Sequence, residues 1–169
     1  MKKTVWVAAA LVLGVLLGSA VCLAGDYGDM RNEKLDKGIE AALRNDTLIG
    51  AVRNNDIGEV EKLISEGVDV NARNSEAWTP FLEAMNRDRV EIARLMINKG
   101  ADVNAKDFGG VTPLMWVAGY NHPDIARLLI EKGADVNARD RDGLTALAIA
   151  EKEGFSEVVQ ILKKSGARY

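Results

Sequence analysis

The feature that most constrains this chain is a glycine-led hexapeptide that recurs every 33 residues. "GADVNA" occurs at 100–105 and again at 133–138, and a near copy, "GVDVNA", occurs at 67–72. A fixed period of this size indicates a stacked repeat architecture, in which each unit buries its apolar face against its neighbours. The chain divides without a gap into blocks of 33 residues that begin at Asp46, Thr79, Thr112 and Thr145.

Each block carries the signals of two helices. Thr79 and Thr112 both precede a proline, a pattern typical of a hydroxyl N-cap followed by proline at the first helical position. We expect a short first helix from there to about Met85 in the second block. Further along, "EIARLMI" (91–97) and "DIARLLI" (124–130) carry apolar residues at i, i+3, i+4 and i+5. This spacing predicts a second helix with one buried stripe.

The hexapeptide itself has the composition of a helix end and a turn. Glycine permits the left-handed conformation that ends a helix, and the Asp and Asn that follow suit a tight turn because their side chains bond nearby backbone. The valine between them is expected to point inward. Each second helix is followed by one of four glycines, Gly67, Gly100, Gly133 and Gly166.

These motifs resemble the ankyrin repeat family, whose pattern is TPLHxAA, a second helix and then GADVNAxDxxG. The resemblance covers 46–169 and implies an all-α solenoid of helix-turn-helix units joined by β-hairpin-like turns. The implied repeats are 46–78, 79–111, 112–144 and 145–169. The family histidine is replaced by Leu82, Met115 and Ala148. We therefore expect the threonine caps to survive and the polar network between helices to be thinner.

The end blocks differ from the middle blocks at positions that face a neighbour. The first block has Glu59 and Lys62 where the internal blocks have isoleucine and leucine, and the last block has Glu151 and Lys163 at positions that are otherwise apolar. Apolar positions become charged where no repeat covers them, which is typical of capping repeats. We expect a complete array of about four repeats with nothing missing after it.

Residues 1–24 have the pattern of a secretory signal peptide, which indicates a periplasmic or secreted bacterial protein. Lys2 and Lys3 precede an apolar stretch from Val5 to Leu17, and "CLA" supplies small residues before a predicted cleavage after Ala24. Two alternatives stay open. Cys22 is the acylated residue if the chain is a lipoprotein, and an uncleaved anchor is long enough to span a bilayer. Only in these two cases do we expect membrane association.

Residues 25–45 lie outside the period and form a predicted N-terminal helix or linker. Two interpretations stay open: an extra helix that covers the first repeat, or a tether or partner-binding segment. Four apolar residues follow each other there at helical spacing, namely Leu35, Ile39, Ala42 and Leu43.

Charge and cysteine usage exclude several classes of function. The chain has 22 basic and 25 acidic residues, and loss of the two lysines in 1–24 takes the net charge from −3 to −5. An acidic domain is a poor candidate for nucleic acid binding. Cys22 is the one cysteine, so the processed chain has neither disulfides nor thiolate metal sites. We expect a monomer without a cofactor.

No motif for catalysis or metal binding is present. His122 is the single histidine, and the resemblance implies that it is a turn residue. "DRDG" (140–143) suggests a calcium loop, but Ala138 and Ile149 would stand at positions 1 and 12, where oxygen ligands are required. There is no phosphate-binding glycine motif and no serine motif beside a histidine. We therefore predict no enzymatic activity, no catalytic residue and no metal site.

The resemblance implies a surface for a partner, built from the turn tips and the exposed faces of the first helices. Aromatic residues are only 5% of the chain, yet four of them map to this surface, and aromatic side chains are enriched at binding hot spots. In the alternative, Trp78 and Trp116 fold back and fill gaps. The predicted partner-binding residues are Trp78, Phe108, Trp116, Tyr120, Glu76, Arg87, Val111, Arg141, Asp142 and Leu144.

The predicted function is a non-catalytic module in the cell envelope that binds a folded protein partner on this concave surface. Two alternatives remain: an inhibitor, immunity or assembly factor for one periplasmic enzyme, and a binder of small molecules or envelope polysaccharide whose aromatic rings stack on sugars.

Overall fold

The computed structural model describes residues 33–74 and 78–168. The predicted signal peptide with its two alternatives, and the predicted site residue Glu76, lie outside the described residues. The chain divides into a unit of residues 1–35 and a unit of residues 36–169, and the second unit holds the repeats. Among the described helices, none is long and apolar enough to cross a membrane.

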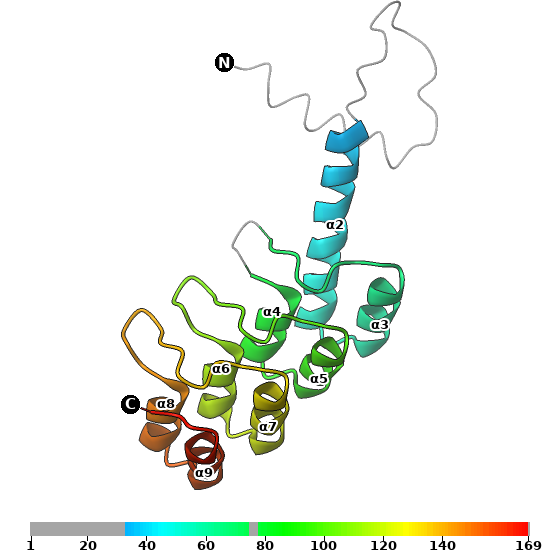
Figure 1. The fold of residues 1–169 in the computed structure, drawn as a ribbon. Coiled ribbons are helices and arrows are strands. Elements are labelled where there is room, and N and C mark those ends of the chain that lie inside the picture. The colour runs from blue at the N-terminus through cyan, green and yellow to red at the C-terminus, as the bar shows by residue number, and fades with distance from the viewer. Residues whose placement is uncertain (1–32, 75–77, 169) are drawn as a thin grey trace, which may run out of the picture. The chain divides into compact units, whose positions relative to one another are not determined.

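The described residues form helices and no strand, and the helices come in four successive pairs (Figure 1). We call the earlier member of each pair the first helix and the later member the second helix. The first helices lie side by side along the array, as do the second helices, and long turns project from one edge. The pairs are α2 (Glu33–Arg53) with α3 (Ile57–Ser65), α4 (Pro80–Asn86) with α5 (Val90–Asn98), α6 (Pro113–Tyr120) with α7 (Pro123–Glu131), and α8 (Ala146–Glu153) with α9 (Ser156–Lys164). The predicted all-α solenoid is confirmed.

Threonine hydroxyls begin three of the four first helices. The side chains of Thr79, Thr112 and Thr145 accept hydrogen bonds from backbone amides three residues later, at 3.1, 3.4 and 3.2 Å. Thr145 caps its helix although alanine replaces proline after it. At Thr112 the sulfur of Met115, in the place of the family histidine, accepts a bond from the cap's own amide at 3.4 Å. The caps therefore survive the loss of that histidine, as predicted.

The hexapeptide ends each second helix as its glycine predicts. The φ angles of Gly67, Gly100, Gly133 and Gly166 lie between 86° and 90°, in the region that favours glycine. The aspartate of the hexapeptide bonds locally: Asp102 Oδ1 accepts from the Asn104 amide at 2.9 Å. The same bond recurs in the neighbouring repeats at 2.8 and 2.9 Å.

The asparagine of the hexapeptide has a different role from the one predicted. We expected its side chain to bond nearby backbone within its own turn, and that expectation is wrong. Asn104 Nδ2 donates to the Gly133 carbonyl at 3.0 Å and Asn104 Oδ1 accepts from the Asp135 amide at 2.8 Å. Asn71 and Asn137 form the same pair of bonds with the repeat that follows each of them. The asparagines therefore tie one repeat to the next.

One hydrophobic core runs through all four helix pairs, from Leu48 to Leu162. It takes the apolar stripes of the second helices together with the inward residues of the first helices, and Val70 and Val103 of the hexapeptides are buried in it as predicted. Val136 is half-buried. Since each pair contributes to its neighbour's core, the position of every first helix depends on the adjacent repeats.

The first helix of the array is longer than the repeat requires. α2 runs without a break from Glu33 to Arg53, so the predicted boundary at Asp46 falls inside a helix. Ile39 and Leu43 are 50% and 62% exposed, so these side chains do not cover the first repeat. At the other end, Lys163 Nζ lies 2.8 Å from Glu151 Oε1. The two charges predicted to cap the last repeat therefore pair with each other.

Candidate partner-binding surface

The turn tips are built by side chains that bond their own backbone. Asp107 Oδ1 accepts from the amides of Gly109 and Val111 at 2.8 and 2.9 Å. In the next repeat, Asp140 Oδ1 accepts from the amides two and four residues later at 3.0 and 2.8 Å. Backbone bonds across each hairpin, such as Asp107 N to Val111 O at 3.2 Å, complete the turns. The tips are thus held in one conformation without strands.

Neighbouring tips also contact each other. The Arg141 amide donates to the Gly109 carbonyl at 2.8 Å. Beside it, Gly110 has φ +78°, and a Cβ there would lie 3.3 Å from the backbone of Asp140 and Arg141. A side chain at this position would be strained by the positive φ and crowded by the neighbouring backbone, which favours glycine. The tips of the second and third repeats therefore present their side chains as one surface.

Apolar residues form a row across these tips. Trp78, Val111 and Leu144 occupy the same place in successive repeats, each closing a hairpin by accepting a bond from the aspartate or asparagine four residues earlier. Trp78 and Val111 are half-buried, while Leu144 is 44% exposed and Phe108 57% exposed. An exposed apolar row of this kind is typical of a binding site.

Two aromatic residues on α6 stack on each other. The rings of Trp116 and Tyr120 have centroids 6.0 Å apart and lie 15° from parallel. Tyr120 is 38% exposed, and its hydroxyl donates to the Asn86 carbonyl of the previous repeat at 2.9 Å. Trp116 is half-buried against the core. Its indole Nε1 is buried and has no acceptor among the described residues. Trp116 thus supports the exposed Tyr120 and is itself largely packing.

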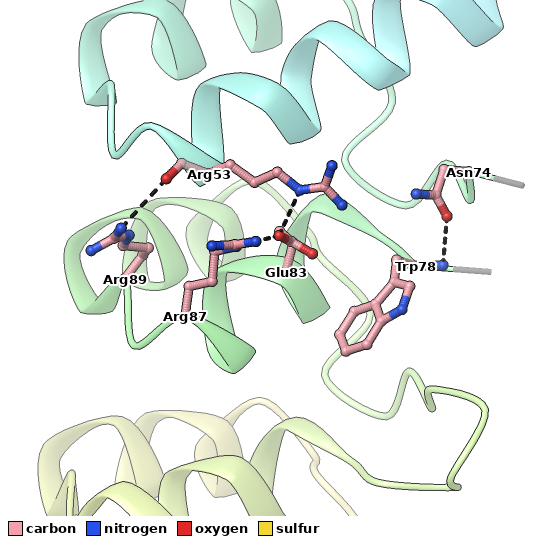
Figure 2. Close-up of polar contacts among 6 residues, drawn as sticks. All are labelled: Arg53, Asn74, Trp78, Glu83, Arg87 and Arg89. Atoms are coloured by element: carbon pink, nitrogen blue, oxygen red, sulfur yellow. Dashed lines mark hydrogen bonds and ion pairs between the residues drawn. The ribbon is translucent and has the colours of Figure 1, made fainter. Parts of the chain in front are cut away.

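A buried carboxylate that we did not predict lies beside this surface. Glu83 on α4 is 3% exposed. Its Oε1 accepts hydrogen bonds from Arg53 Nε at 2.8 Å and from Arg87 Nε at 2.5 Å (Figure 2). Burial acts to raise the pKa of Glu83, but hydrogen bonds and charge from the two guanidiniums outweigh it and hold the pKa below its ordinary value.

The sequence does contain a signal for this carboxylate. In the 33-residue register, the position of Glu83 is occupied by Gly50, Trp116 and Ile149 in the other repeats. A charged side chain that is buried at such a position needs an oppositely charged partner, because an unpaired buried charge is costly. Arg53 comes from the preceding repeat, so the ion pair also joins α2 to α4.

The other predicted binding residues lie in two places, at the third tip and on or beside the first helices. Arg141 and Asp142 are exposed at the third tip, and Arg87 lies on the surface beside Glu83. Trp116 and Tyr120 are in ring contact, whereas no ring contact joins Phe108 or Trp78 to them among the described residues. We call the set Trp78, Arg87, Phe108, Val111, Trp116, Tyr120, Arg141, Asp142 and Leu144 the tip–helix surface.

The surface of the second helices is different in character. Arg94 pairs with Asp124 across one repeat interface, and Arg127 Nη2 pairs with Glu157 Oε1 at 2.8 Å across the next. These pairs join one cation to one carboxylate. The second helices α5, α7 and α9 therefore carry charged pairs, in contrast to the apolar and aromatic tip–helix surface, while Ile57 at the start of α3 is 38% exposed.

The single histidine pairs with an aspartate of the neighbouring turn. His122 Nε2 lies 2.6 Å from Asp88 Oδ1 in the turn of the preceding repeat, which fits the turn position that the resemblance implied. No group of three or more His, Cys, Asp or Glu residues in the described ranges is arranged to hold a metal ion.

Comparison with known families agrees with this architecture. A family model described as ankyrin repeats (three copies) matches residues 48–140 and 108–169. The chain therefore belongs to the ankyrin repeat family, whose members are generally protein–protein interaction modules and typically lack catalytic activity. None of the curated proteins matches the chain.

Proposed function

We propose that this protein is a non-catalytic module that binds a folded protein partner through the tip–helix surface. The observation that carries the proposal is the location of the exposed hydrophobic side chains. Among the described residues, the exposed large hydrophobic side chains are Ile39 and Leu43 on α2, Ile57 at the start of α3, and Phe108, Tyr120 and Leu144. The last three all belong to the tip–helix surface, whereas the second helices α5, α7 and α9 carry ion pairs.

The hydrogen bonds that hold the tips in one conformation support the same function. The tips of the second and third repeats are fixed by Asp107 and Asp140, and a backbone hydrogen bond joins these two tips. A surface that is already ordered loses little conformational entropy when it binds. Exposed aromatic residues on such a surface act as anchors that fill pockets of a partner.

We further propose that the protein acts in the cell envelope. The proposal depends on the sequence of residues 1–24, with cleavage after Ala24 and release into the periplasm or medium. In that compartment, an inhibitor, immunity factor or assembly factor for one enzyme is the specific role that we consider. Fractionation of cells, with the mass of the processed chain, tests the location: an intact N-terminus in the cytosol would contradict it, and acylation at Cys22 would replace cleavage after Ala24.

Site-specific crosslinking in cells tests the binding proposal. A photoreactive residue placed at Phe108 or Leu144 is expected to yield one defined crosslinked protein. The matched controls are exposed positions on second helices, Glu131 on α7 and Gln160 on α9, which should yield none. Equal crosslinking from all four positions would contradict the proposal. Selective retention on envelope polysaccharide, lost when Tyr120 is changed to alanine, would favour the sugar-binding alternative.

A further inference from the structure

We propose that a pocket at the beginning of the array, between α2 and the first hexapeptide, binds the side-chain carboxamide of an asparagine in a protein partner. The two groups that bind it are the backbone carbonyl of Gly67 and the backbone amide of Asp69. The residues that line this pocket lie outside the tip–helix surface. The inference therefore goes beyond the proposed function and does not depend on it.

The later repeats show how the end of a second helix binds a carboxamide. Asn71 Nδ2 donates to the Gly100 carbonyl at 3.1 Å, and Asn71 Oδ1 accepts from the Asp102 amide at 2.8 Å. Asn104 and Asn137 bind the two helix ends that follow with the same pair of bonds, at 2.8 to 3.3 Å. The ends of α5, α7 and α9 thus each bind one carboxamide through one carbonyl and one amide.

The end of α3 offers the same two groups without an asparagine. The φ angle of Gly67 is 88°, and those of its three counterparts are 86° to 90°, so the helix ends alike. Among the described residues, neither the Gly67 carbonyl nor the Asp69 amide has a hydrogen-bond partner. The residue that stands 33 positions before Asn71 is Gly38, which lies within α2 and has no side chain. The first link of the series is therefore open.

A pocket of about 390 Å³ lies over these two groups, far more than the space that one water needs. α2 lies beside the hexapeptide there (Figure 1) and lines the pocket with Glu40, Ala41, Arg44 and Asn45. Arg44 Nη2 is 2.9 Å from Glu40 Oε1, so these two charges compensate each other. Asn45 is half-buried, and its side chain forms no hydrogen bond within the described part of the chain. The lining therefore suits a neutral polar ligand.

A carbonyl beside an amide selects a primary carboxamide, because that group presents an N–H donor and an oxygen acceptor on one edge. A carboxylate has acceptors only and cannot bond the Gly67 carbonyl, whereas ammonium and guanidinium groups have donors only and cannot bond the Asp69 amide. A trans peptide bond directs its N–H and its C=O to opposite sides, so it cannot form both bonds. Asparagine is the expected residue because asparagine forms this pair of bonds at the other three helix ends.

An NMR titration of the whole chain with short peptides tests the proposal. The probe is acetylated GADVNA with an N-methylamide end, so that the asparagine side chain is its sole primary carboxamide. We expect the Asp69 amide resonance to move and to saturate at millimolar peptide. Peptides with aspartate or alanine in place of the asparagine should bind at least about tenfold more weakly, because a donor or an acceptor is then left unpaired.

A substitution on α2 assigns the effect to the pocket. Ala41 is exposed and lines the pocket, so in Ala41→Trp the indole should fill the pocket without disturbing the core and should abolish the shift of Asp69. Ala42→Trp is the matched control, because Ala42 is exposed next to it but does not line the pocket. The control should keep the affinity for the peptide within about twofold of the parent.

Equal binding of the three peptides, or an Asp69 resonance that does not saturate, would overturn the carboxamide site and leave water as the occupant. Equal effects of the two tryptophan substitutions would also overturn it, and if Ala41→Trp does not fold, the peptide series decides alone. Movement of the resonance with protein concentration and without peptide would assign the pocket to a second copy of the chain instead.

The outcome is independent of the proposed function. Phe108→Ala/Tyr120→Ala removes exposed side chains of the tip–helix surface and should bind the asparagine peptide like the parent. Failure of the peptide titration therefore leaves the tip–helix surface untouched, and failure of that surface to bind a partner leaves the pocket at α2 untouched.

Discussion

The side-chain amide of Asn104 spans the interface between two repeats, where its Oδ1 accepts a hydrogen bond from the Asp135 amide at 2.8 Å. Its Nδ2 donates to the carbonyl that ends the next second helix, at 3.0 Å. The same residue at the same place recurs in each hexapeptide. The repetition of "GADVNA" therefore has two causes: each repeat needs the same turn, and each turn holds the following repeat.

Asn104→Ala is expected to lower the free energy of unfolding by about 1–2 kcal/mol, because two hydrogen bonds of ordinary strength are lost. Chemical denaturation monitored by circular dichroism measures this. Asn98→Ala is the matched control, since Asn98 is exposed at the end of α5, and it should change stability by less than about 0.5 kcal/mol. Equal effects from both substitutions would show that Asn104 does not couple the repeats.

The Glu83 cluster predicts a pH dependence of stability. The pKa of Glu83 is lowered in the folded state, so its ionised form stabilises folding above the unfolded pKa, and this contribution is lost as the pH falls through the folded pKa. Glu83→Gln removes the titration. The difference in unfolding free energy between the two proteins should be largest at neutral pH and should shrink below about pH 4. Denaturant titrations at a series of pH values measure it, and a difference that grows in acid would contradict the account.

The stability of α8 depends on the N-cap at Thr145. Its hydroxyl accepts from the Ala148 amide at 3.2 Å, and the threonine is buried. Thr145→Ala should cost about 1 kcal/mol, the usual loss for a hydroxyl N-cap. Thr47→Ala serves as control because Thr47 is an exposed threonine within α2. Thermal denaturation of the two variants separates a cap from a surface hydroxyl, and an equal shift in melting temperature would argue against the cap.

Alanine substitutions at Trp116 and Phe108 are expected to change stability by very different amounts, although both residues were predicted to bind a partner. Trp116 packs against the core, so Trp116→Ala should destabilise by about 2–3 kcal/mol, somewhat below the loss for a fully buried aromatic residue. Phe108 is 57% exposed, and Phe108→Ala should stay within about 0.5 kcal/mol of the parent. Differential scanning calorimetry tests both. A large loss at Phe108 would mean that this ring is part of the core.

Local features of the fold could be predicted from the sequence because they depend on adjacent residues. A Thr-Pro pair specifies a helix start at Thr79, and a glycine after an apolar stripe specifies a left-handed helix end at Gly100. The inward position of the valines follows from their place between the polar Asp and Asn of each hexapeptide. Each of these signals is complete within a few residues, so the rest of the array does not alter it.

Contacts between repeats could not be predicted in the same way. The hydrogen bonds from Asn104 to Gly133 and from Arg53 to Glu83 span 29 and 30 residues, and they depend on how one repeat is rotated against the next. The length of α2 was not predicted, because the 33-residue period places a boundary at Asp46, whereas the helix continues through that residue from Glu33 to Arg53. The resemblance to ankyrin repeats located the tip–helix surface. The half-burial of Trp116 could not be predicted, because it depends on how the side chain packs against the core.

The most direct test of the central claim is the affinity of the crosslinked partner for surface variants that remain folded. Phe108→Ala/Tyr120→Ala/Leu144→Ala should weaken binding at least about a hundredfold, as expected when several hot-spot residues are removed. The control, Glu131→Ala/Gln160→Ala, alters exposed positions on second helices and should bind like the parent. Isothermal titration calorimetry on proteins with matched unfolding curves supplies both values. Affinity within about twofold of the parent for the triple surface variant would contradict the assignment of the tip–helix surface as the binding site.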